Sequence, residues 1–544
     1  MPGTAARHPN DGSPAARRRR FAFWLGSGLT VVGVALHLPM YFEAADMHYR
    51  LVGMPMSTGM TVGMIAIIVG LALSGYGLLP RRADFGKVAG LKVQAVDDAP
   101  IGSVHVRMLL VLAVAVTIDV MKPTTLAFIA PGVTEEYGLK SALNPGGSVP
   151  EALLPLFGIT GTVLGSILWG WLGDRMGRQA AMLYAGIIFV ATSICGAMPS
   201  FTLNLVMCFL MGLGAGGMLP VSFTLLSETI PARHRGWLMV LIGGDVAGGY
   251  AITSWLSETL IPTYSWRVMW LLGLPTGVLL ILLTRWVPES PRYLLAVGRE
   301  HAARAVLARY HAEIKRVDRS ELTVESGISS RYRQLLRPPF LGMTAVVGLV
   351  AVGIGLEKYG FQLWLPTNLR SLGYDGAVAD QMLRNAALIG LPFSVLIAYL
   401  YHRSTRWTLI GLSLVTTASL LGFVIAGDSV ASNHAALYAL LVMPIWGASS
   451  ITAVLSAYAV EVYPTRIRSR ASGFSAAMTK AGGVLIIALV VAAVAAPSLR
   501  ITALLGAIPI AAAAILAFVV TVETRRRRLE DITAAELQLA DISR

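Results

Sequence analysis

Ionisable side chains interrupt several long apolar runs of this 544-residue sequence. They are Asp119, Lys122, Asp245, Glu357, Lys358 and Lys480. An ionisable group near the middle of a bilayer costs ~2.5–3.5 kcal/mol on insertion scales, so one that is present there usually faces a partner or a water-filled path. These residue types in such runs favour the binding and movement of protons or charged solutes over covalent chemistry.

Asp119 and Lys122 are three residues apart and therefore share one face of a helix. A carboxylate whose lysine partner is alternately near and far can take up and release a proton. The two residues can equally form a permanent ion pair that only satisfies both charges.

Lys480 has no acidic residue within one helical turn, so its charge needs a partner from another helix or from a ligand. One such partner is Asp245, because each of the two residues stands shortly before a pair of glycines. Glu357 and Lys358 are neighbours in sequence and point about 100° apart on a helix, so they cannot face the same wall. We expect at most one of these two to be functional, and Lys358 can extend toward the membrane surface.

The composition places these residues in a membrane protein. The sequence is 55% hydrophobic and 14% charged, against about 25% charged residues in a soluble domain. The charges lie between apolar runs of roughly 20 residues, the length that crosses a bilayer. This excludes a soluble enzyme, a nucleic-acid-binding module and a disordered scaffold. The net charge is +14, and the basic residues flank the apolar runs. They therefore indicate how the chain is oriented in the membrane.

The apolar runs predict fourteen membrane-spanning helices. The predicted segments are a basic tail (1–20), two extra spans (21–79), a linker (80–106), a six-helix bundle (107–287), a central loop (288–337), a second six-helix bundle (338–521) and a tail (522–544). Arginine-rich connections alternate with arginine-poor ones, so the positive-inside rule predicts cytoplasmic termini. Many alanines and arginines with few lysines indicate a bacterial protein of the inner membrane.

The two six-helix segments repeat each other. Glu228 and Arg235 follow the fourth span of the first bundle, and Glu461 and Arg468 follow the fourth span of the second. Glu461 comes 233 positions after Glu228, and Arg468 comes 233 positions after Arg235. Two parallel repeats of this kind are typical of transporters that rock around a site at the middle of the membrane. The sequence therefore predicts alternating access to a small-molecule substrate between the two halves.

A glycine-rich and arginine-rich loop follows the second span of the first bundle. Its residues are Gly170, Leu172, Gly173, Asp174, Arg175, Gly177, Arg178 and Gln179. The loop resembles the signature loop of the major facilitator superfamily. The segments PESPRYL at 288–294, ETIPARHRG at 228–236 and ETRRRRLED at 523–531 are similar to the sugar-porter-like branch, which also contains transporters of aromatic acids, organic ions and metabolites.

The resemblance implies an all-α membrane fold of two six-helix bundles, here with two additional N-terminal helices. It also implies that the arginine-rich loops and their acidic partners form an inner gate. The gating residues would be Gly170, Asp174, Arg175, Gly177, Arg178, Glu228, Arg235, Glu461 and Arg468. The alternative is that these residues only orient the helices in the membrane.

The sequence departs from the family pattern at several places. Cys208 stands where the family usually has an arginine, and His402 replaces the acidic residue of the second copy of the loop. The glutamines and asparagines of a sugar site are missing from 348–356, which is apolar apart from glycines. A symmetric gate and a sugar substrate are therefore not the first expectation.

We expect proton-coupled uptake of a small organic anion, a carboxylate. Similar transporters of organic acids often have an arginine at the place of Lys480, so the resemblance makes Lys480 a carboxylate anchor. Asp119 or Glu357 would carry the proton, and Lys122 and Asp245 complete the predicted substrate and proton pathway. A sugar or polyol porter and a non-transporting sensor or partner subunit are the alternatives.

No enzymatic activity, cofactor or metal is expected. The only cysteines, Cys195 and Cys208, lie within apolar runs, and no nucleophile constellation or phosphate-binding loop is present. Histidines and methionines around the first extra spans, such as His37 and His48, lack tight metal-ligand spacing. We expect the two extra helices to serve peripheral packing or the docking of a partner protein.

Overall fold

The structure is a computed structural model that describes residues 14–79, 91–92, 100–141, 144–312, 315–316, 332–338, 340–463, 465–493 and 498–520. Within these residues, thirteen helices are long and apolar enough to cross a membrane, and the apolar helix Val268–Thr284 is shorter. The prediction of an all-helical membrane fold is confirmed, and Val268–Thr284 takes the place of the fourteenth predicted span. Most of the predicted tails 1–20 and 522–544 and of the linker 80–106 lies outside the described residues.

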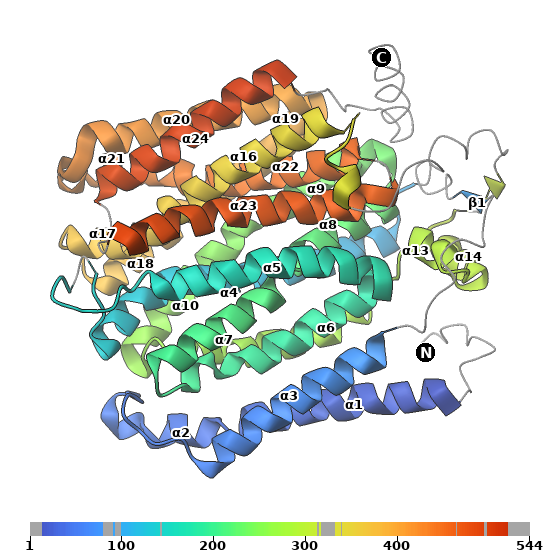
Figure 1. The fold of residues 1–544 in the computed structure, drawn as a ribbon. Coiled ribbons are helices and arrows are strands. Elements are labelled where there is room, and N and C mark those ends of the chain that lie inside the picture. Colours follow the sequence, from blue (N-terminus) through green and yellow to red (C-terminus); the bar gives the residue numbers. More distant parts are fainter. Residues whose placement is uncertain are drawn as a thin grey trace.

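The helices lie side by side in two bundles, with an extra pair of helices beside the first (Figure 1). The first bundle contains α4 (Ser103–Tyr137), α5 (Leu153–Met176), α6 (Arg178–Ala191), η2 (Thr192–Ala197), α7 (Phe201–Ala215), α8 (Met218–Thr229), α9 (Ala232–Gly244), α10 (Val246–Tyr264), α11 (Val268–Leu271) and α12 (Gly273–Thr284). The second contains α16 (Leu341–Gly360), η4 (Gln362–Trp364), α17 (Leu365–Ser371), α18 (Gly376–Gly390), α19 (Phe393–Arg403), α20 (Thr405–Ala426), η5 (Gly427–Ser432), α21 (His434–Val442), the π-helical turn η6 (Met443–Gly447), α22 (Ala448–Val462), α23 (Thr465–Ala493) and α24 (Leu499–Val520).

The fourth span of the first bundle is broken between α7 and α8 at Gly216 and Gly217. A Cβ at Gly217 would lie 2.0 Å from Cγ of Trp169, and one at Gly216 would lie 2.6 Å from the backbone N of Ser166. Only residues without a side chain allow α5 to approach this closely. The break therefore places the carbonyl end of α7 and the amide end of α8 inside the bundle.

The two extra helices, α1 (Pro14–Ala35) and α3 (Thr58–Leu78), pack tightly on each other, and α2 (Leu38–Glu43) and η1 (Ala45–Met47) connect them. A Cβ at Gly33 would lie 2.6 Å from the carbonyl oxygen of Gly63. Tyr184 of α6 donates a hydrogen bond to the carbonyl of Leu71 over 3.1 Å. The close glycine contact and this hydrogen bond attach the pair to the side of the first bundle (Figure 1).

A small layer covers the end of the bundles where α5 finishes. It contains α13 (Pro291–Ala296), α14 (Glu300–Arg309), η3 (Tyr332–Gln334) and the antiparallel strands β1 (Leu91–Lys92) and β2 (Lys315–Arg316). Its apolar core includes Tyr293, Leu307 and Tyr310, and the Tyr310 ring lies 4.7 Å from the His105 ring at the start of α4. The segment between the bundles is thereby packed against the first bundle.

Candidate functional site: two bundle-closing networks and a charged centre

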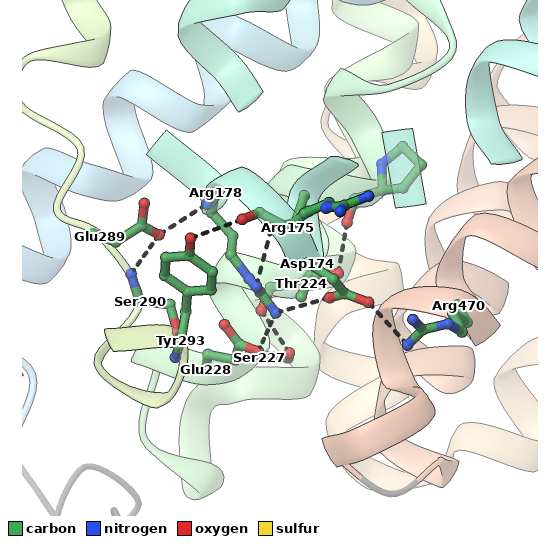
Figure 2. A network of polar contacts seen from close by, with 12 residues as sticks. Asp174, Arg175, Arg178, Thr224, Ser227, Glu228, Glu289, Ser290, Tyr293 and Arg470 are labelled. Atoms are coloured by element: carbon green, nitrogen blue, oxygen red, sulfur yellow. Dashed lines mark hydrogen bonds and ion pairs between the residues drawn. The ribbon is translucent and has the colours of Figure 1, made fainter. Parts of the chain in front are cut away.

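Arg178, at the start of α6, is the centre of a buried polar network at the end of the first bundle (Figure 2). Its guanidinium donates to Glu228 Oε1 over 2.9 Å, to Asp174 Oδ1 over 3.4 Å and to the Gly173 carbonyl over 3.1 Å. Charge-assisted bonds of this kind are stronger than neutral ones, and they offset the cost of burying the charges. The network joins the ends of α5, α6 and α8.

Glu289 binds the amide end of α6 from the segment before α13 (Figure 2). Its Oε1 accepts from the backbone N–H groups of Arg178 (2.8 Å) and Ser290 (2.9 Å), and its Oε2 accepts from that of Gln179 (3.3 Å). A carboxylate satisfies the free amides at a helix start and is favoured by the helix dipole there. Burial raises the pKa of Glu289, and these backbone amides and Arg178 counter that shift.

Gly177 makes this capping possible because it adopts φ +95°. A Cβ there would lie 2.3 Å from Glu289 Oε2 and would strain the backbone in the left-handed region. The signature loop and the PESPRYL segment, which are distant in sequence, are thus two halves of one structural unit.

Asp174 connects the two bundles. Its Oδ2 accepts from the Arg470 guanidinium of α23 over 3.1 Å (Figure 2). Nearby, a Cβ at Gly473 would lie 3.6 Å from the Cα of Gly170, so α5 and α23 approach closely at this level. The loop of the first bundle is therefore placed where separation of the bundles would break an ion pair.

The other predicted gating residues lie at the same end. Arg175 stacks over the Trp171 ring at 4.9 Å, and its carbonyl accepts from Tyr293. Arg235 is buried and donates to the Ile230 carbonyl over 3.2 Å. In the second bundle, Glu461 Oε2 accepts from Tyr401 over 2.8 Å, and Arg468 is buried. The Glu461 carboxylate also meets the first bundle, since a Cβ at Gly236 would lie 2.7 Å from its Oε1.

At the centre, Lys480 of α23 reaches into the first bundle. Its ammonium donates to Ser166 Oγ over 2.8 Å and to the Gly216 carbonyl over 3.4 Å. The Gly216 carbonyl lies at the end of α7, where the helix dipole favours a positive charge. Lys480 and Lys358 both interact electrostatically with the buried carboxylate of Asp119 on α4. The structure thus brings one acid from the first bundle together with two lysines from the second.

Lys122 does not pair with Asp119. Its ammonium points into the interior of the first bundle, 5.9 Å from the Phe189 ring centre, and a Cβ at Gly273 would lie 2.1 Å from it. It has no hydrogen-bond partner among the described residues. The residue spacing gave both side chains the same helical face, but the neighbouring helices direct their tips apart.

Asp245 does not pair with Lys480, and Glu357 borders the centre through Lys358 only. Asp245 accepts a hydrogen bond from Thr117 of α4, so the bridge to Lys480 considered from the sequence is not formed. Glu357 is fully buried against α24, where a Cβ at Gly506 would lie 3.4 Å from its Cγ, and neither carboxylate oxygen has a hydrogen-bond partner among the described residues. Of the neighbours Glu357 and Lys358, Lys358 is the one that interacts with Asp119.

A second network joins the bundles at the opposite end. Ser257 of α10 donates to Asp380 Oδ2 of α18 over 2.6 Å, and Glu258 forms an ion pair with Arg384. Arg370 lies 3.9 Å from Asp380 Oδ1. The bundles are therefore held together by polar contacts at both ends, with the Asp119 and Lys480 centre between them.

The sequence patterns did not single out several of these residues. Asp380, Ser166 and Arg470 matter because of their partners on distant helices, and no local spacing indicates them. Glu289 lies within the PESPRYL segment, but its bond to the α6 amides could be seen only in the fold. Within the described part of the chain, no group of three or more His, Cys, Asp or Glu residues could hold a metal ion.

Comparison with known proteins is consistent with this arrangement. Residues 152–535 match the family described as sugar (and other) transporter. The chain is 28% identical over 402 residues to the niacin transporter NiaP of Acinetobacter baylyi, which covers 72% of this chain and 88% of that protein. It is 30% identical over 388 residues to the inner membrane metabolite transport protein YgcS of Escherichia coli, covering 68% and 80%.

A third relative is the 4-hydroxybenzoate transporter PcaK of Acinetobacter baylyi, at 27% identity over 423 residues, covering 73% of this chain and 86% of that protein. Among solved structures, the proton:xylose symporter XylE of the major facilitator superfamily matches with a TM-score of 0.62 at 18% identity, over 79% of this chain and 98% of that one. At this identity the structural match concerns the fold alone.

Proposed function

Because the chain belongs to the sugar (and other) transporter family of the major facilitator superfamily, we propose that it takes up a small organic anion together with protons. As a member of that family it is a multi-pass secondary transporter and not an enzyme. The proposal concerns the substrate class, the coupling ion and the direction of transport.

One observation carries the choice of an anion. The centre of the bundle interface holds two lysines of the second bundle, Lys358 and Lys480. Asp119 and Glu357 balance their charges, but the ammonium of Lys358 has no hydrogen-bond partner among the described residues and can donate to a ligand. Such an interface favours an anion over a cation or a neutral sugar. The names of the relatives support the same class, since niacin and 4-hydroxybenzoate are carboxylic acids.

Proton coupling would use Asp119. Its carboxylate lies between bundles that must separate for access, so its distance from Lys480 changes during the cycle. A carboxylate that loses a nearby ammonium favours its protonated form, and it releases the proton when the ammonium returns. A proton that enters with the anion also neutralises the charge moved across the membrane, where each elementary charge is worth ~2.3 kcal/mol per 100 mV.

The proposed orientation rests on the arginine-rich connections. By the positive-inside rule they favour both termini in the cytoplasm of a bacterial cell, with the protein in its inner membrane. The end with Arg178 and Arg470 is then the cytoplasmic one. The exposed apolar side chains of α1 and α3, such as Trp24 and Ile65, are available to lipid or to a docking partner.

The test is thermal unfolding of the purified protein in detergent with matched panels of carboxylates, sugars and organic cations. A ligand at 100 times its dissociation constant stabilises the fold by ~2.7 kcal/mol. We expect a rise in the unfolding midpoint with carboxylates alone. A rise with sugars and none with carboxylates would instead favour the sugar or polyol porter.

Proton coupling is tested in proteoliposomes with an inside-alkaline pH gradient. The stabilising carboxylate should accumulate in wild-type vesicles, and Asp119→Asn should abolish accumulation while leaving exchange of internal for external substrate. A protein that binds carboxylates but neither accumulates nor exchanges them would be the non-transporting sensor.

A further inference from the structure

Lys358 differs from Lys480, the other lysine at the centre of the bundle interface. It lies on α16 and is half-buried, and its ammonium has no hydrogen-bond partner among the described residues. Lys480, by contrast, is engaged by Ser166 and the Gly216 carbonyl. Lys358 is thus the cation of this centre whose donors are available to a ligand.

The packing of α16 explains why Lys358 faces the interface. One side of the helix lies against α23, where a Cβ at Gly355 would be 1.8 Å from the Thr479 carbonyl. A second side lies against α24, where a Cβ at Gly353 would be 2.9 Å from the Pro509 carbonyl. Lys358 follows Gly355 by three residues, so it starts beside the α23 side of the helix and well away from the α24 side. From there its ammonium interacts electrostatically with Glu357 beside it and with Asp119 of the other bundle.

The position of Lys358, near the end of α16, is also suitable for binding a ligand. Buried polar atoms without hydrogen-bond partners follow Lys358 closely in sequence, where the seventh core span is broken into α16, η4 and α17. They are Gln362 Oε1, Trp364 Nε1, Thr367 Oγ1 and Asn368 Nδ2. Buried polar groups are normally satisfied by protein, water or a ligand, so this break marks a place that accepts polar atoms from elsewhere.

We propose that Lys358 binds the carboxylate of a monocarboxylate substrate, while Lys480 holds α23 to the first bundle. The proposal rests on the proposed function, because it assumes that the transported molecule is an organic anion. It assigns the anchor to α16 and not to α23.

The restriction to one carboxylate follows from the charges at the centre. A single available ammonium, a point charge and not a bidentate fork, pairs with one carboxylate. A second carboxylate on the same ligand would be buried near Asp119 without a partner, and an unpaired buried charge is costly. Aromatic or aliphatic monoacids should therefore bind, and the corresponding diacids should bind much more weakly.

The experiment uses the full-length protein in detergent and four small molecules of similar shape. Binding of nicotinate, nicotinamide, 4-hydroxybenzoate and the diacid terephthalate is measured from thermal unfolding and by direct titration. The variants are Lys358→Gln, Lys358→Arg and Lys480→Gln. In the wild-type protein we expect the monoacids to bind at least tenfold more tightly than the amide and the diacid.

Lys358→Gln should remove the preference for acid over amide, and Lys358→Arg should retain it because the charge remains. Lys480→Gln should keep the preference while lowering the unfolding midpoint without ligand. If Lys358→Gln retains the preference, or if Lys480→Gln removes it, the assignment to Lys358 is overturned although the anion proposal stands. If no acid stabilises the wild-type protein, the proposed function itself fails.

A purely structural role for Lys358 gives a different result. If its charge only balances Glu357 and Asp119, Lys358→Gln lowers the stability of the empty protein and leaves the ratio of acid to amide affinity unchanged. The double variant Glu357→Gln with Lys358→Gln removes both neighbouring charges. It supplies a second folded background in which loss of the acid preference is expected, should the single variant fail to fold.

Discussion

Buried carboxyl groups in this protein differ in how their charge is satisfied. Glu289 accepts three backbone N–H groups and lies near Arg178, so its charge has several donors. Glu151, just before α5, has one donor, Thr134, at 2.6 Å from its Oε2, and its Oε1 has no hydrogen-bond partner among the described residues. Burial raises the pKa of Glu151 to about 7, and the bond from Thr134 only partly counters this.

The stability of the protein should therefore depend on pH through Glu151. Because the fold favours the neutral acid, the stability contributed by Glu151 is complete below the ordinary pKa of 4.5 and is lost as the pH rises through about 7. The loss is ~3 kcal/mol for a pKa shift of this size. The unfolding midpoint in detergent should fall between pH 5 and pH 8, and Glu151→Gln should reduce that fall.

The control for this prediction is Glu135→Gln. Glu135 forms an exposed ion pair with Arg50, and such pairs contribute little to stability. Its variant should keep the wild-type pH dependence. Equal pH dependence in the Glu151 variant would mean that another group causes it.

At the scale of elements, the broken helices matter most. The break between α7 and α8 exposes the Gly216 carbonyl to Lys480, and the amide end of α8 faces Asp119 through the N–H of Leu219. Each helix end therefore meets the charge that its dipole favours. The glycines that allow the break therefore position the two helix ends that interact with Lys480 and Asp119.

Gly217→Ala tests this dependence on close packing. A Cβ at that position would meet Trp169 at 2.0 Å, so the helix end or the ring must move. Overpacking of this kind typically costs ~1–3 kcal/mol. We expect a lower unfolding midpoint and weaker carboxylate binding, measured on the same purified protein.

Gly411→Ala is the matched control, because Gly411 lies inside α20 with no atom within 4 Å of an added Cβ. Alanine is the better helix former, so this variant should be neutral or slightly stabilising. A Gly217 variant that behaves like the Gly411 variant would show that the break tolerates a side chain.

At the scale of the whole molecule, the two bundles are joined at both ends. Asp174 and Arg470 join them at the end that carries the signature loop, and Asp380 joins them to Ser257 at the other end. Alternating access requires that one set of contacts opens while the other stays closed. We therefore predict that the two networks set the balance between the two open states.

Asp380→Ala should open the end where Asp380 lies. A hydrogen bond to a charged group contributes ~1.5–3 kcal/mol, which is a tenfold or larger change in population. The opening is measured as the distance between nitroxide labels at the exposed positions Thr259 and Val378, introduced as cysteines after replacement of Cys195 and Cys208 by alanine. The variant should add longer distances to the wild-type distribution.

Arg470→Ala is the control at the opposite end. It removes a partner of Asp174 and should leave the distances between the labels on Thr259 and Val378 unchanged or shorter. If Asp380→Ala leaves the distribution of the folded protein unchanged, the contacts of Asp380 do not control that end.

The sequence alone was sufficient for the membrane class and for the fold of two six-helix bundles. A bilayer sets the length of an apolar run and the places where arginines gather, so the sequence shows both directly. The spacing of Glu228 and Glu461 shows the repeat in the same direct way. The loop residues Asp174 and Arg178 lie at a bundle end, because charged residues gather where helices leave the membrane, and their role in a gate stays a prediction.

Only the tertiary structure decided which charges meet. Asp119 and Lys122 share a helical face, yet Asp119 interacts with Lys480 and Lys358 of the other bundle. Lys122 points between helices of its own bundle. Glu357 and Lys358 are adjacent in sequence and face different helices. Helical spacing gives the direction in which a side chain starts, but the partner at its tip depends on which distant helix packs there, and close glycine contacts determine that packing.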